Sequence, residues 1–292
     1  MKELFGILFL VWIGLVWAVP LDSSEHGVAA GTKTTNCTCG WKNQGVKRIV
    51  GGEEAGEHEY PMIAGIVYKD TEILFCGSTI VTPRHLMTAA HCTHPFLDNP
   101  HQIGIHVGGH NYHKVKRTTK LKDVEKVFIH PSFNKNNLKF DMSMILLKER
   151  LQFDQKVGPA CMPTSRLALV GEKLRVIGWG LTEHKGKPSE VLRKVDLDVK
   201  PHEDCMFNYI YLEIFSKHQL CTFSRGKDSC SGDSGGPLFW LNPETNRYTL
   251  AGLVSYGSFC GRSPSVNTEV SALINWYTKL ISETDPSMKI CA

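Results

Sequence analysis

The sequence predicts an all-β protein that ends in a single helix. From residue 49 onward, short apolar or alternating runs are separated by glycine, proline and asparagine turns, which is the pattern of antiparallel strands. Clear examples are residues 62–68, 174–177 and 250–254. The C-terminal segment differs, because its apolar side chains recur at helical spacing behind Ser271, a candidate N-cap. These helical positions are Leu273, Ile274, Tyr277, Leu280 and Ile281.

Length and composition are those of an ordinary folded protein. The chain has 292 residues, of which 42% are hydrophobic and 21% charged. All-β units of this size commonly occur as single domains. The formal net charge of +4 is too small to indicate a nucleic-acid partner. We therefore expect one globular domain and no nucleic-acid binding.

The N-terminal segment predicts secretion. An apolar stretch over residues 4–19 contains Ala18, which is small enough for cleavage by signal peptidase. The stretch is shorter than the ~20 apolar residues of a membrane-spanning helix. We expect a signal peptide over residues 1–18, then a leader over residues 19–48 that is flexible over 19–36. The protein is then secreted and extracellular, with no membrane anchor.

Candidate catalytic chemistry centres on Ser234. It lies in residues 228–237, where glycines and acids surround one hydroxyl. A hydroxyl becomes a nucleophile only when a base takes its proton and the resulting oxyanion is stabilised. Two partners lie upstream: His91, followed by Cys92, and Asp141, at the start of an apolar run. The chain order of histidine, aspartate and serine is that of the chymotrypsin type, and it differs from the orders in subtilisin and the α/β-hydrolases.

Further short motifs occur in the same chain. They are Arg48-Ile-Val-Gly-Gly52, His130-Pro-Ser-Phe-Asn134, Gly178-Trp-Gly180, Ser255-Tyr-Gly257 and residues 270–276. Together with the three candidate catalytic residues, they resemble the trypsin-like branch of the chymotrypsin-family serine proteases, from about Cys39 to the C-terminal helix. The resemblance implies two packed six-stranded antiparallel β-barrels with a C-terminal helix, and a peptidase domain over residues 49–292. The leader and residues 59–65 are also similar, more weakly, to arthropod venom and salivary proteases.

The resemblance assigns the catalytic roles. His91 is the general base and then the general acid, and Asp141 holds the imidazole in the required tautomer. The backbone N–H groups of Gly232 and Ser234 form the oxyanion hole. The competing interpretation is a silent or weakly active homologue that binds partners. We favour the enzyme, because none of the three catalytic residues is replaced.

The specificity pocket is also implied. Asp228 corresponds to its base, and a buried carboxylate there selects Arg or Lys before the scissile bond. Ser229, Ser255 and Gly257 complete the substrate-binding set. Ser265 departs from the family, which has glycine at this pocket wall. Its hydroxyl could narrow the pocket, hydrogen-bond a lysine ammonium, or occupy Asp228 and weaken catalysis; we expect basic specificity at lower efficiency.

Activation is implied at the bond after Arg48. Its cleavage by a trypsin-like protease frees the ammonium of Ile49, which pairs with Asp233 and orders the pocket. The uncut chain is therefore expected to be a zymogen. The partners implied are protein or peptide substrates with Arg or Lys, the activating protease and protein protease inhibitors.

Ten cysteines in a secreted chain indicate disulfides. The family pattern pairs Cys76 with Cys92, Cys205 with Cys221, Cys230 with Cys260, and Cys39 with Cys161. Cys37 and Cys291 have no family partner, and we expect them to pair with each other; an intermolecular bond is the alternative. Asn36 begins a glycosylation sequon whose middle residue is Cys37, so its occupancy stays open.

No cofactor or metal is expected. Gly109 stands where the family's calcium loop has its first carboxylate, and residues 110–117 contain no acid. The same region is basic, which would suit an exosite for acidic protein ligands. The alternative is an ordinary solvated loop. Its cations are Lys114, Lys116, Arg117, Lys120 and Lys122.

Overall fold

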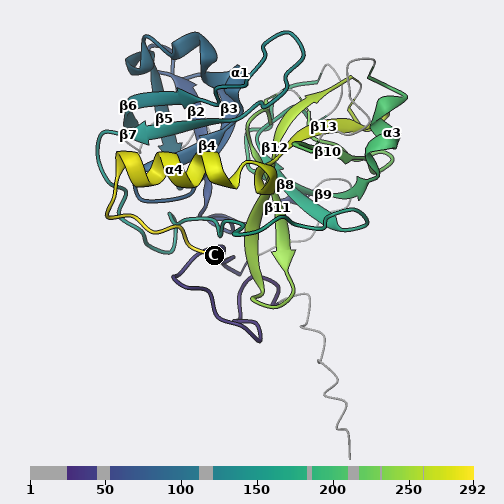
Figure 1. Ribbon diagram of the computed structural model, residues 1–292, viewed down its shortest axis with the longest axis horizontal. Helices are drawn as coiled ribbons and strands as arrows, with labels where there is room; N and C mark the ends of the chain where they lie inside the picture. Colours follow the sequence, from purple (N-terminus) through teal and green to yellow (C-terminus); the bar gives the residue numbers. More distant parts are fainter. Residues whose placement is uncertain are drawn as a thin grey trace, which may run out of the picture.

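The protein folds as two antiparallel β-barrels that lie side by side, the first blue to teal and the second green to yellow (Figure 1). The computed structural model describes residues 25–44, 53–111, 121–182, 186–209, 217–230, 232–258 and 260–292. Each barrel closes six strands, so the predicted all-β fold with two six-stranded barrels is confirmed.

The first barrel closes in the order β2-β3-β4-β7-β6-β5. Its core consists mainly of branched aliphatic side chains, such as Ile66, Ile105 and Ile145, which suit the crowded interior of a small barrel. The strands are β2 (Ile63–Tyr68), β3 (Leu74–Ile80), β4 (His85–Thr88), β5 (Ile103–Val107), β6 (Lys122–Ile129) and β7 (Ser143–Leu147).

The second barrel closes through the pairing of β8 with β9, and the short strand β1 (Glu53–Glu54) pairs with the first two residues of β9. Its own core includes Leu174, Leu197 and Leu238. The six strands are β8 (Lys173–Gly178), β9 (Arg193–Lys200), β10 (Gln219–Thr222), β11 (Pro237–Asn242), β12 (Arg247–Gly257) and β13 (Ser265–Glu269).

A third buried cluster joins the two barrels. It combines Met87 and Met144 of the first barrel with Phe239 and Leu250 of the second and Tyr277 of the C-terminal helix. Burial of these large side chains on both partners fixes how the barrels pack. Loops that leave either barrel at this interface are therefore held at defined positions.

The C-terminal helix α4 (Ile274–Thr284) lies against the first barrel, as the yellow ribbon in Figure 1 shows. Its N-cap residue is Leu273, so the prediction of Ser271 as the cap was wrong. Ser271 lies in the preceding turn η3 (Val270–Ala272), where its hydroxyl donates to Glu269 Oε1 at 2.6 Å. The other short helices of the described residues are α1 (Ala90–Thr93), η1 (His94–Phe96), η2 (Pro100–Gln102) and α3 (His202–Met206).

The leader segment over residues 25–44 packs beneath the β11–β12 hairpin, next to the chain's C-terminus (Figure 1). The side chain of Asn246 is 1% exposed and holds this segment from within. Its Oδ1 accepts the Gly27 N–H at 3.0 Å, and its Nδ2 donates to the carbonyls of Glu25 and Ala29 at 2.9 and 2.8 Å. The predicted flexibility of the leader was therefore wrong for residues 25–36, because these buried hydrogen bonds fix the backbone.

Five disulfides join the cysteines in the expected pairs: Cys37–Cys291, Cys39–Cys161, Cys76–Cys92, Cys205–Cys221 and Cys230–Cys260. The first two attach the leader to the C-terminus and to the segment before β8. Within the described ranges, no helix has the length and apolar character needed to cross a membrane.

Candidate active site

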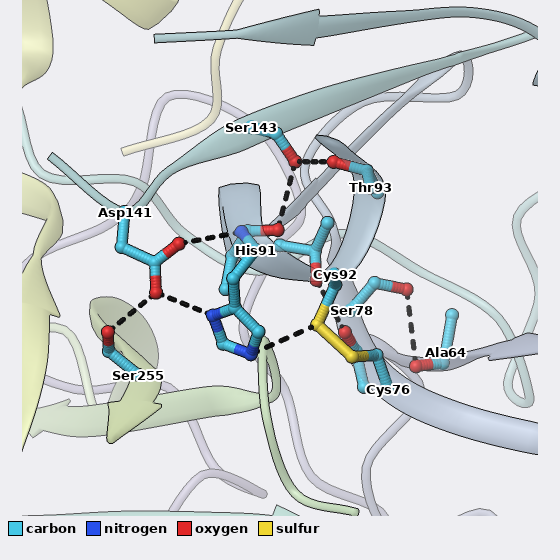
Figure 2. The surroundings of a disulfide bond; sticks show 12 residues. Ala64, Cys76, Ser78, His91, Cys92, Thr93, Asp141, Ser143 and Ser255 are labelled. Atoms are coloured by element: carbon cyan, nitrogen blue, oxygen red, sulfur yellow. Dashed lines mark hydrogen bonds and ion pairs between the residues drawn. A yellow bond between two sulfur atoms is a disulfide. The ribbon is translucent and has the colours of Figure 1, made fainter. Parts of the chain in front are cut away.

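His91 and Asp141 form a close pair at the junction of the barrels (Figure 2). His91 lies in α1, the short helix that follows β4, and Asp141 lies two residues before the start of β7. The Asp141 carboxylate is fully buried; one oxygen accepts the His91 backbone N–H at 2.8 Å, and the other lies 2.7 Å from Nδ1. A carboxylate can only accept here, so Nδ1 carries the hydrogen and Nε2 remains the basic nitrogen.

Neighbouring side chains hold Asp141 in place. Ser255 on β12 donates its hydroxyl to Asp141 Oδ2 at 2.6 Å (Figure 2), and Thr268 on β13 donates to the Asp141 carbonyl at 2.8 Å. Both donors come from the second barrel, so they connect the acid to the barrel that carries Ser234. Ser255 was expected to bind substrate; in the structure its hydroxyl supports the acid.

A ring stack orders the turn before Asp141. Phe140 has a φ of 53°, a left-handed conformation that is unfavourable for a bulky residue. Its ring lies parallel to His218 at 3.9 Å and to His130 at 5.0 Å. His130 belonged to a recognised motif, and Phe140 lies directly before the predicted catalytic acid. The contributions of Phe140, His218 and Thr268 have no signal in the sequence, because they depend on contacts between distant segments.

Ser234 lies at the same junction. Its carbonyl accepts the Gly77 N–H of the first barrel at 2.8 Å. The next residue, Gly235, has a φ of 72°, and a Cβ there would collide with the Thr88 hydroxyl. This close approach seats the serine loop against the segment that leads into His91.

The expected triad also needs a hydrogen bond between Ser234 and His91, and this bond is not formed in the structure. Between the described residues Ser234 and His91 there is no hydrogen bond, and His91 Nε2 has instead a weak contact with Cys92 Sγ at 3.7 Å (Figure 2). The structure thus brings all three residues to one junction and joins two of them directly.

Gly232 and Asp233 shape the loop that precedes the serine. Gly232 has a φ of 97°, which only glycine adopts without strain. Asp233 turns inward, where its two oxygens accept the backbone N–H groups of Gly180 at 2.8 Å and Cys230 at 2.9 Å. Burial raises the pKa of Asp233 to about 6. A cavity of about 100 Å³ adjoins this carboxyl and is also lined by Gly180 and Asp228.

Asp228 is the second inward-facing carboxyl. Its Oδ2 accepts the Gly261 N–H at 3.0 Å, and the Ser265 hydroxyl lies 2.9 Å from Oδ1 and 3.2 Å from Oδ2. Burial raises the pKa of Asp228 to about 6. Ser229 beside Asp228 is buried. Gly257 on β12, which pairs with Ser265, is exposed. Of the three alternatives for Ser265, the structure has the hydroxyl on Asp228.

Among the described residues, no group of metal-binding side chains is brought together in a usable form. Ligand atoms of Cys76, His91 and Cys92 lie within 4.8 Å of one another, but both sulfurs belong to one disulfide and are not thiolates. Arg48 and Ile49 lie outside the described residues, as do the predicted exosite cations Lys114, Lys116, Arg117 and Lys120.

Comparison with known proteins agrees with this arrangement. The family model described as Trypsin matches residues 49–277. A venom serine protease of Polistes dominula is 38% identical over 266 residues, which are 88% of this chain and 93% of that protein. Venom serine protease 34 of Apis mellifera is 36% identical over 88% of this chain, and the match spans 63% of that longer relative. The clotting factor G beta subunit of Tachypleus tridentatus is 31% identical over 94% of this chain and 93% of its own length. The chain therefore belongs to the trypsin family of serine endopeptidases.

Proposed function

We propose that this protein is a secreted serine endopeptidase that cleaves peptide bonds after Arg or Lys through Ser234, His91 and Asp141. The observation that carries the proposal is the buried Asp141 carboxylate, which orients His91 through two hydrogen bonds of 2.8 and 2.7 Å. This arrangement leaves Nε2 basic and directed away from the acid.

The chemistry follows from these roles. His91 Nε2 takes the Ser234 hydroxyl proton as the serine oxygen attacks the scissile carbonyl carbon, and the carbonyl π electrons move onto its oxygen. The N–H groups of Gly232 and Ser234 stabilise that oxyanion. When the tetrahedral intermediate collapses, the C–N bond breaks and His91 returns the proton to the leaving amine. Water then repeats the sequence on the acyl-enzyme and releases the acid product.

Specificity for basic residues rests on Asp228. Its carboxyl is partly buried and its raised pKa shows the cost of holding a charge there, a cost that a substrate cation offsets. Ser229 and Gly257 would line the same pocket, and the Ser255 backbone would bind the substrate chain. Protein or peptide substrates with Arg or Lys, and protein protease inhibitors, are the partners that fit this pocket.

Activation would follow cleavage after Arg48 by a protease of trypsin-like specificity. The new Ile49 ammonium would pair with Asp233, whose carboxyl adjoins the cavity of about 100 Å³. In the uncut chain, two backbone N–H groups of the described residues, those of Gly180 and Cys230, donate to Asp233. An ammonium would add a positive charge beside this carboxyl and lock the oxyanion loop.

Secretion is supported by the apolar start of the chain and by five disulfides, which persist in oxidising compartments. The division is a signal peptide over residues 1–18, a leader over 19–48 and a peptidase domain over 49–292. Because relatives include venom proteases and a clotting factor subunit, we infer a role in venom, saliva or an extracellular cascade. The alternative is a weakly active or silent homologue that acts as a binding protein.

The test is to cleave the purified protein with immobilised trypsin, remove the beads, and assay Arg and Lys peptide amides. The expected result is activity that appears only after cleavage and is lost in Ser234→Ala. Activity that persists in Ser234→Ala contradicts the mechanism, and no activity in the cleaved wild type supports the binding-protein alternative.

A further inference from the structure

We propose that Ser265 makes the pocket prefer lysine over arginine before the scissile bond. This inference rests on the proposed function, because it assumes that Asp228 binds the substrate cation. It adds the discriminating group, which is a hydroxyl placed on the carboxylate itself.

The Ser265 hydroxyl bridges the edge of the carboxylate. Ser265 begins β13, pairs with Gly257 on β12, and is 3% exposed. Its Oγ lies 2.9 Å from Asp228 Oδ1 and 3.2 Å from Oδ2. A Cβ built on Gly257 would lie 2.6 Å from the same Oγ. The hydroxyl therefore stands between the exposed Gly257 and the acid.

The carboxylate has further donors. Gly261 N–H reaches Oδ2 at 3.0 Å, and the backbone of Ser229 also hydrogen-bonds Asp228. The Gly261 and Ser229 N–H groups and the Ser265 hydroxyl, which is near both oxygens, together occupy lone pairs on Oδ1 and Oδ2. A carboxylate offers about four acceptor sites in all. While Ser265 holds this position, Asp228 therefore has no free pair of sites, one on each oxygen, for a substrate group that donates two parallel hydrogen bonds.

Arginine and lysine depend differently on that edge. A guanidinium binds a carboxylate best through two parallel N–H bonds, one to each oxygen, and it cannot accept a hydrogen bond from serine. An ammonium is a compact donor that needs one oxygen at a time. It can donate to Asp228 and also to Ser265 Oγ, which still has lone pairs while it donates to the acid. Lysine thus keeps its contacts, whereas arginine must displace the hydroxyl or lose one bond.

The experiment compares kcat/KM for two peptide amides that differ only by Lys or Arg before the scissile bond. The trypsin-cleaved wild type is compared with Ser265→Ala and Ser265→Gly, and Ser258→Ala serves as a control at an exposed serine near the pocket. We expect the wild type to prefer Lys. The Lys/Arg ratio should fall about tenfold in both Ser265 variants, the effect of about one charge-assisted hydrogen bond, and stay unchanged in Ser258→Ala.

Inhibition provides a second readout that needs no turnover of peptide. Benzamidine presents two parallel N–H groups, and butylammonium presents one charged head. The inhibition constant of butylammonium divided by that of benzamidine should be about tenfold higher in the Ser265 variants than in the wild type, because benzamidine gains its second hydrogen bond.

The outcomes separate this inference from the proposed function. An enzyme that cleaves both peptides with the same ratio in wild type and Ser265→Gly refutes the role of Ser265 and leaves basic specificity intact. A wild-type preference for Arg also refutes it. If the cleaved wild type processes neither peptide but does process peptides with an uncharged residue at that position, the proposed role of Asp228 fails as well.

Discussion

Asp233 Oδ1 accepts the Gly180 N–H at 2.8 Å, and this contact turns the carboxyl away from the neighbouring Ser234 into the protein interior. The carboxyl of the residue beside the proposed nucleophile therefore faces the Gly180 backbone. The Asp233 carboxyl lies against the loop that would form the oxyanion hole, and burial raises the pKa of this carboxyl to about 6.

Asp233→Asn should gain stability relative to the wild type, both uncut, as the pH rises toward neutrality. The folded pKa of about 6 exceeds the ordinary 3.8, so the folded state binds the proton more tightly. Ionisation of Asp233 therefore lowers the free energy of unfolding. This effect is absent below pH 3.8, grows as the pH rises and is complete above about pH 6. The urea midpoint of Asp233→Asn relative to wild type should rise between pH 4 and pH 7. A pH-independent difference contradicts the assigned titration. The cleaved variant should also stay inactive.

His106 should make the protein sensitive to acid. Its ring on β5 is 4% exposed, and neither nitrogen has a hydrogen-bond partner in the part of the chain that the structure describes. Burial lowers its pKa from 6.5 to about 4, so stability is lost as the pH falls through this range, to a total of about 3 kcal/mol. His106→Leu should retain that stability at pH 4 in urea unfolding. The exposed His101→Leu is the matched control, and equal acid loss in wild type and His106→Leu would show that this site is not responsible.

Asp141→Asn should abolish most catalysis without unfolding the protein. An amide can present its NH₂ group to His91 Nδ1 and stabilise the wrong tautomer. In serine proteases with this arrangement the change lowers kcat about 10⁴-fold. Ser255→Ala removes one donor to the carboxylate and should cost far less, about tenfold. Steady-state kinetics, with the concentration of active enzyme determined by active-site titration, would measure the loss of kcat in each variant. Equal losses in the two variants would mean that Asp141 acts only as a structural anchor.

The leader should remain attached after activation. Two disulfides, Cys37–Cys291 and Cys39–Cys161, link it to the rest of the chain. After cleavage at Arg48, non-reducing electrophoresis should show one band and reducing electrophoresis two. Replacing either cysteine pair with serine should leave a single non-reduced band, and only the four-serine variant should release the leader in denaturant. Release from a variant that lacks one pair would contradict the assigned connectivity.

Much of the fold and site could be predicted because short segments carry it. The strand pattern, the C-terminal helix and the order of His91, Asp141 and Ser234 are local or depend on spacing along the chain. The remaining features depend on contacts across the fold. The leader is ordered by the amide of Asn246, more than 200 positions away, and the hydroxyl of Ser271 bonds Glu269 and so does not cap α4.

The position of Ser265 shows the same division. The sequence indicated that a hydroxyl replaces the usual glycine, but the direction of that hydroxyl depends on its neighbours in the fold, Gly257 and Asp228. In the folded structure Ser265 Oγ lies 2.9 Å from Asp228 Oδ1, and this distance decides among the three alternatives for the hydroxyl. The stack of Phe140 between His130 and His218 could not be predicted for the same reason.

The central claim is that Ser234 is a nucleophile that His91 activates after cleavage at Arg48. The most direct measurement is labelling with diisopropyl fluorophosphate, followed by mass spectrometry of the peptide that contains Ser234. The account predicts one phosphoryl group per chain on Ser234 in the cleaved wild type, and far slower labelling in the uncut protein and in cleaved His91→Ala. Stoichiometric labelling of another residue, or labelling of Ser234 at the same rate in His91→Ala, would contradict it.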